Sequence, residues 1–483
     1  MSQSPSVFST VMMENLSRRV AVFAATAAAF GPLPPANPFA GPIGTATMHG
    51  DTASSDSTPL AGPGRGRVIA RFQELGAACP TTLVGRDGMP LALCTSIATR
   101  APSVVLLDPA TGVPLATHEL AKGNLFAGVY PFLDSADRVV LADGSGNLLR
   151  IAHERSALGA WQLSVASSLP LGRALAERCG DLCGGVVGLA PDWRGRVWFA
   201  AAHGLAGLAD PRTGAVRVLR LGGGKELIAN SISTVPGGTA VATDHALYEL
   251  AAGRRGVPHV RWRRPYDRGP ARKPGQLSQG TGATPTYFGP RTGTDYLAIT
   301  DNAAPREHLL VFRGRTGRLV CRVPVLPGPV SGTENSPVGS GRSVFVANTY
   351  GYPYPAEPAD APPAQPATAP FTGGLTRVDV RSGGRGCSTR WRAMIRSAAV
   401  PRLSLGDGAL YTVERTSPSD PTATTPLDSY ALAEIDPATG RVESRQPIGA
   451  TAAQDTLQMA PTIAPGGVLY QGTISGIVRV SPG

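Results

Sequence analysis

The chain has 483 residues, of which 45 are Lys or Arg, 34 are Asp or Glu, 59 are Gly and 45 are Pro, and its formal net charge is +11. Gly and Pro interrupt almost every window that is long enough for a helix, which excludes a helical bundle. Because 42% of the residues are hydrophobic, the chain can build a packed core, which excludes global disorder. The positive charge comes almost wholly from Arg and is spread along the chain, so we expect no nucleic-acid partner.

The first 40 residues are predicted to be an export signal. Ser17, Arg18 and Arg19 precede an apolar run over residues 20–30, and small residues and prolines follow it. This order is typical of a signal peptide, and we expect cleavage near Ala40. The arginine pair resembles a twin-arginine signal, but residues 20–22 lack the usual Phe-Leu, so a general secretory signal stays open. The alternative is a disordered leader.

Residues 41–65 contain Gly, Ser, Thr and Pro without periodicity, which predicts a flexible spacer. The apolar run before them is shorter than the roughly 20 residues that a membrane-spanning helix needs, and no later segment approaches that length. We therefore expect a soluble, monomeric protein without a membrane span, located in the periplasm, in the cell envelope or outside the cell.

The six cysteines agree with export, because an even number without a metal-type Cys-x-x-Cys pair indicates disulfides. Cys79 and Cys94 flank a hairpin turn at residues 85–88 and are equidistant from its centre, so they are expected to face each other across two strands. Cys179 and Cys183 would close a small loop, with a redox pair as the alternative. Cys321 would then pair with Cys387, and six free thiols remain the competing interpretation.

A unit of about fifty residues repeats along the chain from residue 66 onward. Each unit contains short apolar strands and an Asp- or Gly-initiated turn that ends in Thr-Gly or Ser-Gly, as in residues 108–112, 210–214, 314–317, 379–383 and 436–440. Asp bonds its own backbone in such turns, and Gly supplies the positive φ. Four short strands per unit at this period predict the blades of a β-propeller.

We count eight four-stranded blades over residues 66–483, with seven as the alternative. The last unit, residues 454–480, supplies only three strands, and residues 66–73 are predicted to add the missing outer strand. This pairing would close the ring through the two ends of the chain and remove an exposed edge. Two insertions, residues 352–372 and 414–429, are predicted to be surface loops.

The Asp-x-x-Thr-Gly turns resemble those of quinoprotein-like propellers, the repeat family named for pyrroloquinoline quinone (PQQ). The resemblance covers residues 66–483 and implies that a Trp after the turn docks neighbouring blades, a role for Trp161, Trp262 and Trp391. Residues 192–200 and 210–214 also look like streptogramin-lyase and gluconolactonase-type propellers. Other phrases, such as residues 348–352, resemble exported bacterial propellers of unassigned function. PQQ is an implied cofactor, but no particular residue supports it.

Polar residues at blade entries and in loops between strands are expected to converge at the mouth of the ring. The predicted ligand-binding residues are Asn230, Asp244, Asp301, Asn302, Glu334, Asn335, Asn348 and Tyr350. Asp301 and Glu334 could give oxygen ligands to Ca²⁺ or another divalent metal. The alternative interpretation is that these residues satisfy backbone groups in turns and caps.

The sequence does not assign a molecular activity. Our leading hypothesis is an exported binding or scaffolding module that holds a small molecule, a glycan or a protein at the mouth of the ring. The alternative is a metal- or quinone-dependent enzyme, of lactonase, lyase or dehydrogenase type, with an axial active site. A basic cluster over residues 254–273 is a further candidate, for an anionic envelope polymer. No catalytic residue can be named.

Overall fold

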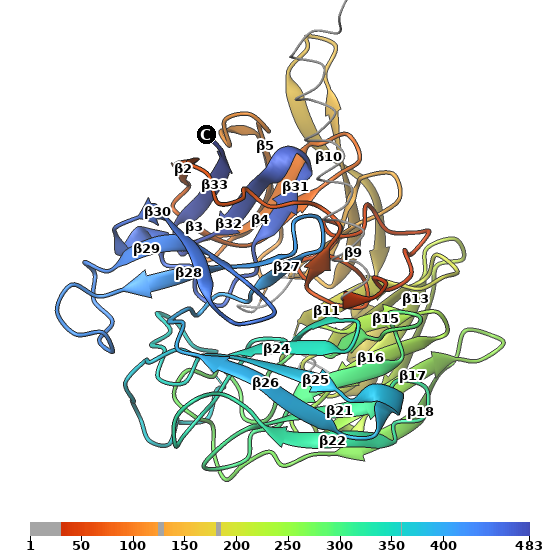
Figure 1. The fold of residues 1–483 in the computed structure, drawn as a ribbon. Helices are drawn as coiled ribbons and strands as arrows, with labels where there is room; N and C mark the ends of the chain where they lie inside the picture. Colours follow the sequence, from red (N-terminus) through yellow and green to blue (C-terminus); the bar gives the residue numbers. More distant parts are fainter. Residues whose placement is uncertain (1–29, 124–129, 180–184, 359) are drawn as a thin grey trace, which may run out of the picture.

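The computed structural model describes residues 30–123, 130–179, 185–358 and 360–483, and these form an eight-bladed β-propeller (Figure 1). The expected count of eight blades is confirmed. The only α-helix in the described part of the chain is the short α2 (Gly172–Cys179), between the second and third blades. Short 3-10 turns occur at Gly222–Gly224, Ser382–Gly384, Ala452–Gln454 and Pro465–Gly467.

The first four blades follow one another along the chain, and each is an antiparallel sheet of four sequential strands. Their strands are β3 (Ala77–Val84), β4 (Pro90–Ser96), β5 (Pro102–Leu107) and β6 (Pro114–Glu119); β7 (Phe132–Leu133), β8 (Val139–Ala142), β9 (Asn147–Arg155) and β10 (Trp161–Pro170); β11 (Val186–Pro191), β12 (Val197–Ala201), β13 (Leu205–Asp210) and β14 (Ala215–Arg220); and β15 (Ser233–Val235), β16 (Gly238–Ala242), β17 (Ala246–Ala252) and β18 (Pro258–Pro265).

The last four blades continue this order, and the seventh has a fifth strand from the N-terminal segment. Their strands are β19 (Thr286–Phe288), β20 (Tyr296–Thr300), β21 (His308–Arg313) and β22 (Leu319–Pro324); β23 (Val338–Ser340), β24 (Ser343–Ala347), β25 (Leu375–Val380) and β26 (Cys387–Ala393); β27 (Arg402–Ser404), β28 (Ala409–Thr416), β29 (Ser429–Ile435) and β30 (Val442–Gly449), with β1 (Ser57–Thr58) parallel to β27; and β31 (Thr462–Ala464), β32 (Val468–Gly472), β33 (Gly476–Pro482) and β2 (Val68–Glu74).

The two ends of the chain close the ring, as the sequence predicted. Strand β2 pairs antiparallel with β33, in a register that runs from Val68 opposite Pro482 to Glu74 opposite Gly476. The two strands lie side by side in Figure 1. The N-terminal strand therefore becomes the outer strand of the last blade, and the first and last blades share a core that contains Val105 and Tyr470.

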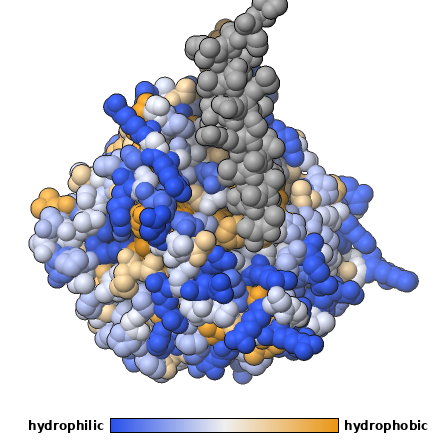
Figure 2. Space-filling model, viewed as in Figure 1, coloured by the Kyte–Doolittle hydropathy of each residue, from blue (hydrophilic) through white to orange (hydrophobic). Residues whose placement is uncertain are grey.

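The core lies between neighbouring blades. The middle strands are buried on both faces, as in β12, where all five residues are buried, whereas outer strands such as β14 alternate between half-buried and exposed residues. Each pair of adjacent blades shares an apolar cluster; Val140 of the second blade, for example, belongs to the same cluster as Phe199 of the third. Figure 2 shows that the visible face is mainly hydrophilic, with small separate hydrophobic patches.

Two of the expected tryptophan contacts join neighbouring blades. Trp262 on β18 donates its indole N–H to the carbonyl of Gly314 in the fifth blade, at 3.3 Å. Trp391 on β26 donates in the same way to Pro437 in the seventh blade, at 3.0 Å. Both acceptors belong to Thr-Gly turns of the repeat. Trp161 packs against the core shared by the first and second blades.

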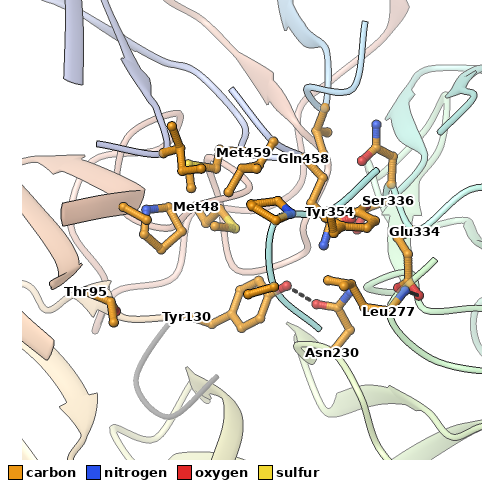
Figure 3. Close-up of a pocket in the computed structure, with 18 of the residues that line it drawn as sticks. Met48, Thr95, Tyr130, Asn230, Leu277, Glu334, Ser336, Tyr354, Gln458 and Met459 are labelled. Carbon is orange, nitrogen blue, oxygen red and sulfur yellow. Dashed lines mark hydrogen bonds between the residues drawn. The ribbon is translucent and has the colours of Figure 1, made fainter. Parts of the chain in front are cut away.

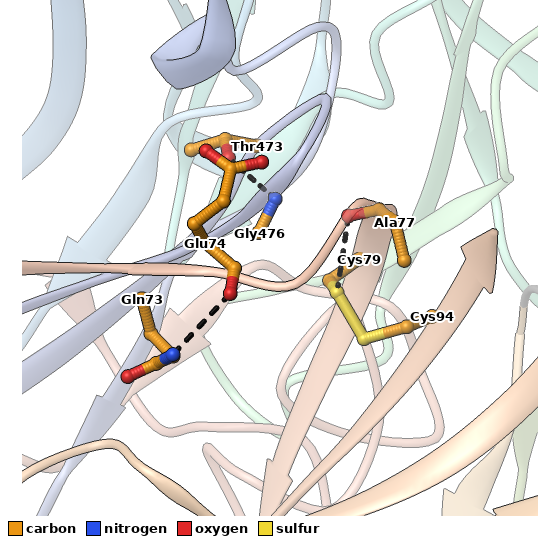
Figure 4. Close-up of a disulfide and its surroundings, with 7 residues drawn as sticks. All are labelled: Gln73, Glu74, Ala77, Cys79, Cys94, Thr473 and Gly476. Atoms are coloured by element: carbon orange, nitrogen blue, oxygen red, sulfur yellow. Dashed lines mark hydrogen bonds between the residues drawn. A yellow bond between two sulfur atoms is a disulfide. The ribbon is translucent and has the colours of Figure 1, made fainter. Parts of the chain in front are cut away.

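Two of the three expected disulfides are formed. Cys79 and Cys94 are bonded across β3 and β4 (Figure 4), and Cys321 and Cys387 join the outer strands of the fifth and sixth blades. The Cys179–Cys183 pairing lies outside the described residues. Each observed disulfide therefore fixes either a hairpin within one blade or the contact between two blades.

Residues 41–65 differ from the flexible spacer that the sequence predicted. Residues 44–46 and 48–58 are buried, and this segment runs inside the ring. Its carbonyl groups accept hydrogen bonds from the ends of successive inner strands: Thr45 from Val84, Ala46 from Leu133, Thr52 from Thr234, Ala53 from Tyr287, Ser55 from Gly339, Asp56 from Leu403 and Thr58 from Leu405. We call residues 41–60 the axial segment. It fills the end of the ring axis where the inner strands finish.

Candidate functional site

A cavity lies on the ring axis at the end where the inner strands begin, and it adjoins a wider cavity toward the mouth. The axial cavity has a volume of about 260 Å³ and the outer cavity about 810 Å³. Residues that border both are Thr95, Arg100, Tyr130, Asn230, Leu277, Glu334, Ala356 and Gln458. Because the axial segment occupies the other end of the axis, the axial cavity is a blind pocket that is reached from the mouth.

The lining of the axial cavity is mostly apolar. The apolar side chains are Met48, Ala78, Pro80, Ile97, Leu277, Pro355, Ala356, Val400, Leu457, Met459 and Ile474. The other lining residues carry polar groups but contribute the smaller part of the exposed surface, and Figure 3 shows Glu334 and Ser336 on one side of the cavity and Met48 and Thr95 on the other. An apolar pocket with a few convergent polar groups is the usual form of a site for a small molecule.

His49 comes from the axial segment and lines the cavity beside Met48. Its Nδ1 lies 2.8 Å from Oδ2 of Asp56, and both residues are buried. Because the carboxylate can only accept, this contact places the proton of a neutral imidazole on Nδ1 and leaves Nε2 as an acceptor. Nε2 is buried and has no hydrogen-bond partner among the described residues.

Arg402 on β27 holds Asp56 in place. Its Nη1 lies 3.1 Å from Oδ1 of Asp56, and neither side chain is exposed. Its other nitrogens donate to the carbonyls of Pro461, at 2.8 Å, and Met48, at 2.5 Å. Nη1 and Oδ1 of Asp56 make no hydrogen bond among the described residues, so their contact is an ion pair; together with the two bonds to carbonyls it ties the axial segment to two blades.

Glu334 lies four residues before the start of β23 and is only 3% exposed. Its Oε1 accepts the backbone N–H groups of Leu277 and Ser278, at 2.5 and 2.7 Å. Burial raises the pKa of this carboxyl to about 7, although these hydrogen bonds act in the opposite direction. Gly282 provides the room for the other oxygen, because a Cβ there would lie 1.9 Å from Oε2.

Tyr130 and Asn230 form the side of the cavity between these groups. The Tyr130 hydroxyl donates to Oδ1 of Asn230, and the Asn230 amide donates to the carbonyl of Gly282 (Figure 3). The Tyr130 ring stacks on the His49 ring, with centroids 6.0 Å apart and planes 18° from parallel. Burial raises the pKa of Tyr130, so its hydroxyl stays protonated at neutral pH.

The structure brings together only some of the residues that the sequence predicted. Asn230, Glu334 and Asn335 line the axial cavity, and Asp244 lines the outer cavity. The other four, Asp301, Asn302, Asn348 and Tyr350, line neither. Asn302 and Asn348 use their side-chain amides on backbone carbonyls, of Arg268 and Ala271 and of Gly373 respectively, which is the turn-stabilising role that we kept as the alternative.

Asp301 has an electrostatic environment different from that of Glu334. Its carboxylate accepts the backbone N–H of His308 at 2.7 Å and lies 3.2 Å from the Arg322 guanidinium. His308 Nδ1 is 3.0 Å from the same carboxylate. Asp301 therefore has two cationic or titratable neighbours and lines neither cavity. No group of three or more His, Cys, Asp or Glu side chains in the described ranges could hold a metal ion.

PQQ does not fit the axial cavity. The quinone carries three carboxylates, which need several cations or a metal ion as partners. Among the residues that the structure describes, Arg100 is the only Lys or Arg that lines this cavity, and Glu334 would face the quinone with a carboxyl group of its own. Most of the remaining lining is apolar. We therefore derive no chemistry through a bound quinone.

The insertion at residues 352–372 is part of the site. Residues 354–356 line the axial cavity, and residues 356–358 and 360–362 line the outer one. Arg272 holds the insertion through two hydrogen bonds of 2.8 Å to the carboxylate of Glu357, and Tyr354 donates to Gln458 at 2.9 Å. This predicted surface loop thus forms a wall between the blades and the mouth.

The basic cluster at residues 254–273 is largely neutralised by acidic neighbours. Four of its arginines lie near carboxylates, with Arg261 3.2 Å from Glu249, Arg263 2.8 Å from Glu226, Arg268 2.9 Å from Asp244 and Arg272 2.8 Å from Glu357. Lys273 donates to two backbone carbonyls at 2.7 Å. The cluster therefore reinforces the fourth blade and the mouth.

Sequence reasoning missed His49, Asp56, Arg402 and Tyr130. The two residues of the axial segment were hidden because that segment has no strand periodicity and resembles a linker. Arg402 and Tyr130 were not distinguishable from ordinary strand and loop residues. A usable signal was the density of small residues around His49: Gly44 and Gly50 both have positive φ, and both pack against neighbours that a side chain would strike.

No family model matches the chain, and no curated protein matches it. Solved propellers share its fold. The Dos1 propeller is 7% identical with a TM-score of 0.50, covering 87% of this chain and 95% of that chain. BamB from Moraxella catarrhalis is 11% identical, with a TM-score of 0.47 and coverages of 86% and 96%. Virginiamycin B lyase from Staphylococcus aureus is 9% identical, with a TM-score of 0.43 and coverages of 86% and 99%. The likeness to the Dos1 propeller supports the shared fold and nothing beyond it.

None of the helices in the described part of the chain has the length and apolarity that a bilayer crossing needs.

Proposed function

We propose that this protein is an exported propeller that binds a small, largely apolar molecule in the axial cavity. The observation that carries the proposal is the blind pocket itself. It is closed by the axial segment, lined mainly by apolar side chains, and supplied with His49, Asn230 and Glu334 as polar groups. Burial of apolar ligand surface would supply most of the binding free energy, and the polar groups would set orientation.

Export is supported by the two disulfides and by the composition of the N-terminus. Bonds such as Cys79–Cys94 and Cys321–Cys387 persist in oxidising compartments. The apolar run after Arg18 and Arg19 has the length of a signal segment. The ligand would therefore be met in the periplasm, in the cell envelope or outside the cell.

The binding proposal can be tested with anilinonaphthalene sulfonate, a dye that fluoresces in apolar pockets. Ala78 lines the axial cavity and is half-buried, so Ala78→Trp should fill the pocket. Ala215 on β14 is also half-buried and lines neither cavity, so Ala215→Trp is the matched control. We expect saturable one-site binding to wild type and to Ala215→Trp, and at least tenfold weaker binding to Ala78→Trp.

Circular dichroism and thermal unfolding would confirm that both variants keep the fold. Equal dye affinity in all three proteins would contradict the proposal, as would the lack of saturable binding to the wild type.

A further inference from the structure

The pair of His49 and Asp56 has a geometry that a ligand pocket does not need for binding alone. His49 is 4% exposed, Asp56 is 0% exposed, and Nδ1 and Oδ2 are 2.8 Å apart. His49 lines the axial cavity, and its Nε2 is a buried acceptor without a partner among the described residues. A buried acceptor without a partner costs free energy, which is expected where a reacting group takes the vacant position.

The support behind this pair is rigid. Asp56 has a positive φ of 55°, which is unfavourable for a residue with a side chain and indicates that its surroundings impose the conformation. Arg402 fixes the carboxylate from β27, while the backbone carbonyl of Asp56 accepts the N–H of Leu403 at 3.0 Å. A carboxylate that orients a histidine and stabilises its protonated form is the arrangement that general-base catalysis uses.

A second residue of the lining supplies a proton donor. Glu334 lines the same cavity as His49, and its Oε1 already accepts two backbone N–H groups, which leaves Oε2 for a ligand. Burial raises the pKa of Glu334 to about 7, so about half of the molecules carry the protonated carboxyl at pH 7, and this form can donate a hydrogen bond to a developing oxyanion.

We propose that His49 is a general base that removes a proton from carbon in a small, largely apolar carbonyl compound bound in the axial cavity, with Glu334 as the hydrogen-bond donor to the carbonyl oxygen. The inference rests on the proposed binding function and adds a reaction to it.

The reaction needs no oxidant, reductant or co-reactant. His49 Nε2 takes a proton from the carbon next to the carbonyl, the C–H electron pair forms a C=C bond, and the carbonyl π electrons move to oxygen, which Glu334 stabilises. In a substrate with a C=C bond between its β and γ carbons, the resulting dienolate takes the proton back from Nε2 at the γ carbon; the C=C bond moves to the α and β carbons and the oxygen electrons restore the carbonyl. The substrate class is therefore a small β,γ-unsaturated ketone or ester that isomerises by proton transfer.

The test uses 5-nitrobenzisoxazole, a small aromatic probe that reports on a base in an apolar pocket. The base removes the C3 proton, the C–H pair completes a nitrile, and the N–O bond breaks to release a coloured phenolate. We expect the wild type to accelerate this reaction over buffer. The acceleration by His49→Gln should be at least tenfold smaller than that by the wild type. His153→Gln is the matched control, because His153 also pairs with an aspartate, Asp87 at 2.5 Å, but lines neither cavity.

Added imidazole gives a second readout. We expect it to restore part of the lost rate in His49→Gly, where the vacated volume can hold the free base. Equal rates in wild type and His49→Gln, or no acceleration by the wild type, would overturn the inference. Dye binding to His49→Gln distinguishes a missing base from a missing pocket. If the variant binds the dye as the wild type does, a lower rate reports the loss of the base and not of the pocket.

Discussion

Glu334 shows how a single residue can make the stability of the molecule depend on pH. Burial raises the pKa of this carboxyl from 4.5 to about 7, so the folded state holds a proton that the unfolded state has released between these values. The protonated carboxyl therefore makes its full contribution to the stability of the folded state below about pH 4.5, and this contribution is lost as the pH rises toward 7.

Glu334→Gln removes this titration while its amide oxygen can still accept the two backbone N–H groups. We measure the free energy of unfolding in urea for both proteins. The difference between variant and wild type should favour the variant by about 2–3 kcal/mol more at pH 8 than at pH 5. Glu119→Gln, at an exposed position on β6, serves as the control and should show no comparable gain. A Glu334→Gln difference that is equal at both pH values would contradict this account of the buried carboxyl.

At the scale of the element, the Thr-Gly turns act as docking points between blades. Gly317 has a positive φ of 63°, and a Cβ there would lie 2.5 Å from the Trp262 ring. Gly214 occupies the same place in its own repeat, with a φ of 72°, but a Cβ there would meet nothing within 4 Å. A comparison of substitutions at these two glycines therefore separates the cost of backbone strain from the cost of disturbing the contact between blades.

We expect Gly214→Ala to lower the free energy of unfolding by about 1–2 kcal/mol through backbone strain alone. Gly317→Ala should lose a further 1–3 kcal/mol or so, because the new methyl group must displace the Trp262 ring. Urea unfolding of both variants measures the difference. Equal losses would show that the Trp262 contact does not constrain the turn.

The residues just before the axial segment set a limit on where the exported chain begins. Phe30 packs in the core between the sixth and seventh blades, and the Asn37 amide donates to the carbonyl of Pro191 at 2.9 Å. Cleavage near Ala40, as the sequence predicted, would remove both contacts.

We therefore expect the mature N-terminus to lie between the end of the apolar run and Asn37, so that the contact of Asn37 with Pro191 is kept. Intact-mass measurement and N-terminal sequencing of protein recovered from the exported fraction give its position. A chain that starts at or after residue 38 would show that neither contact is needed in the mature ring.

At the scale of the whole molecule, the sequence predicted the ring but not its filled axis. The turns at residues 210–214 and 314–317 repeat with regular strands between them, and this local pattern determines the blade count and the pairing of β2 with β33. Residues 41–60 make backbone hydrogen bonds with six different blades. Contacts of this kind follow no periodicity, so the segment resembled a spacer.

The candidate site was predictable where its residues have a fixed place in the repeat. Asn230 and Glu334 come just before the inner strands β15 and β23, and this position places them near the axis. Asp301 and Asn348 directly follow the second strands β20 and β24, and there their side chains form hydrogen bonds with nearby backbone groups. His49 and Asp56 lie outside the repeat, so only the folded ring shows that they meet.

The central claim is that the axial segment and the blades together form a pocket for a small ligand. A crystal structure of the wild-type protein grown with anilinonaphthalene sulfonate tests this claim most directly. We expect residues 41–60 inside the ring, and the dye in the cavity that is lined by Met48, His49 and Glu334. A dye molecule bound only elsewhere, or an axial segment that lies outside the ring, would contradict the account.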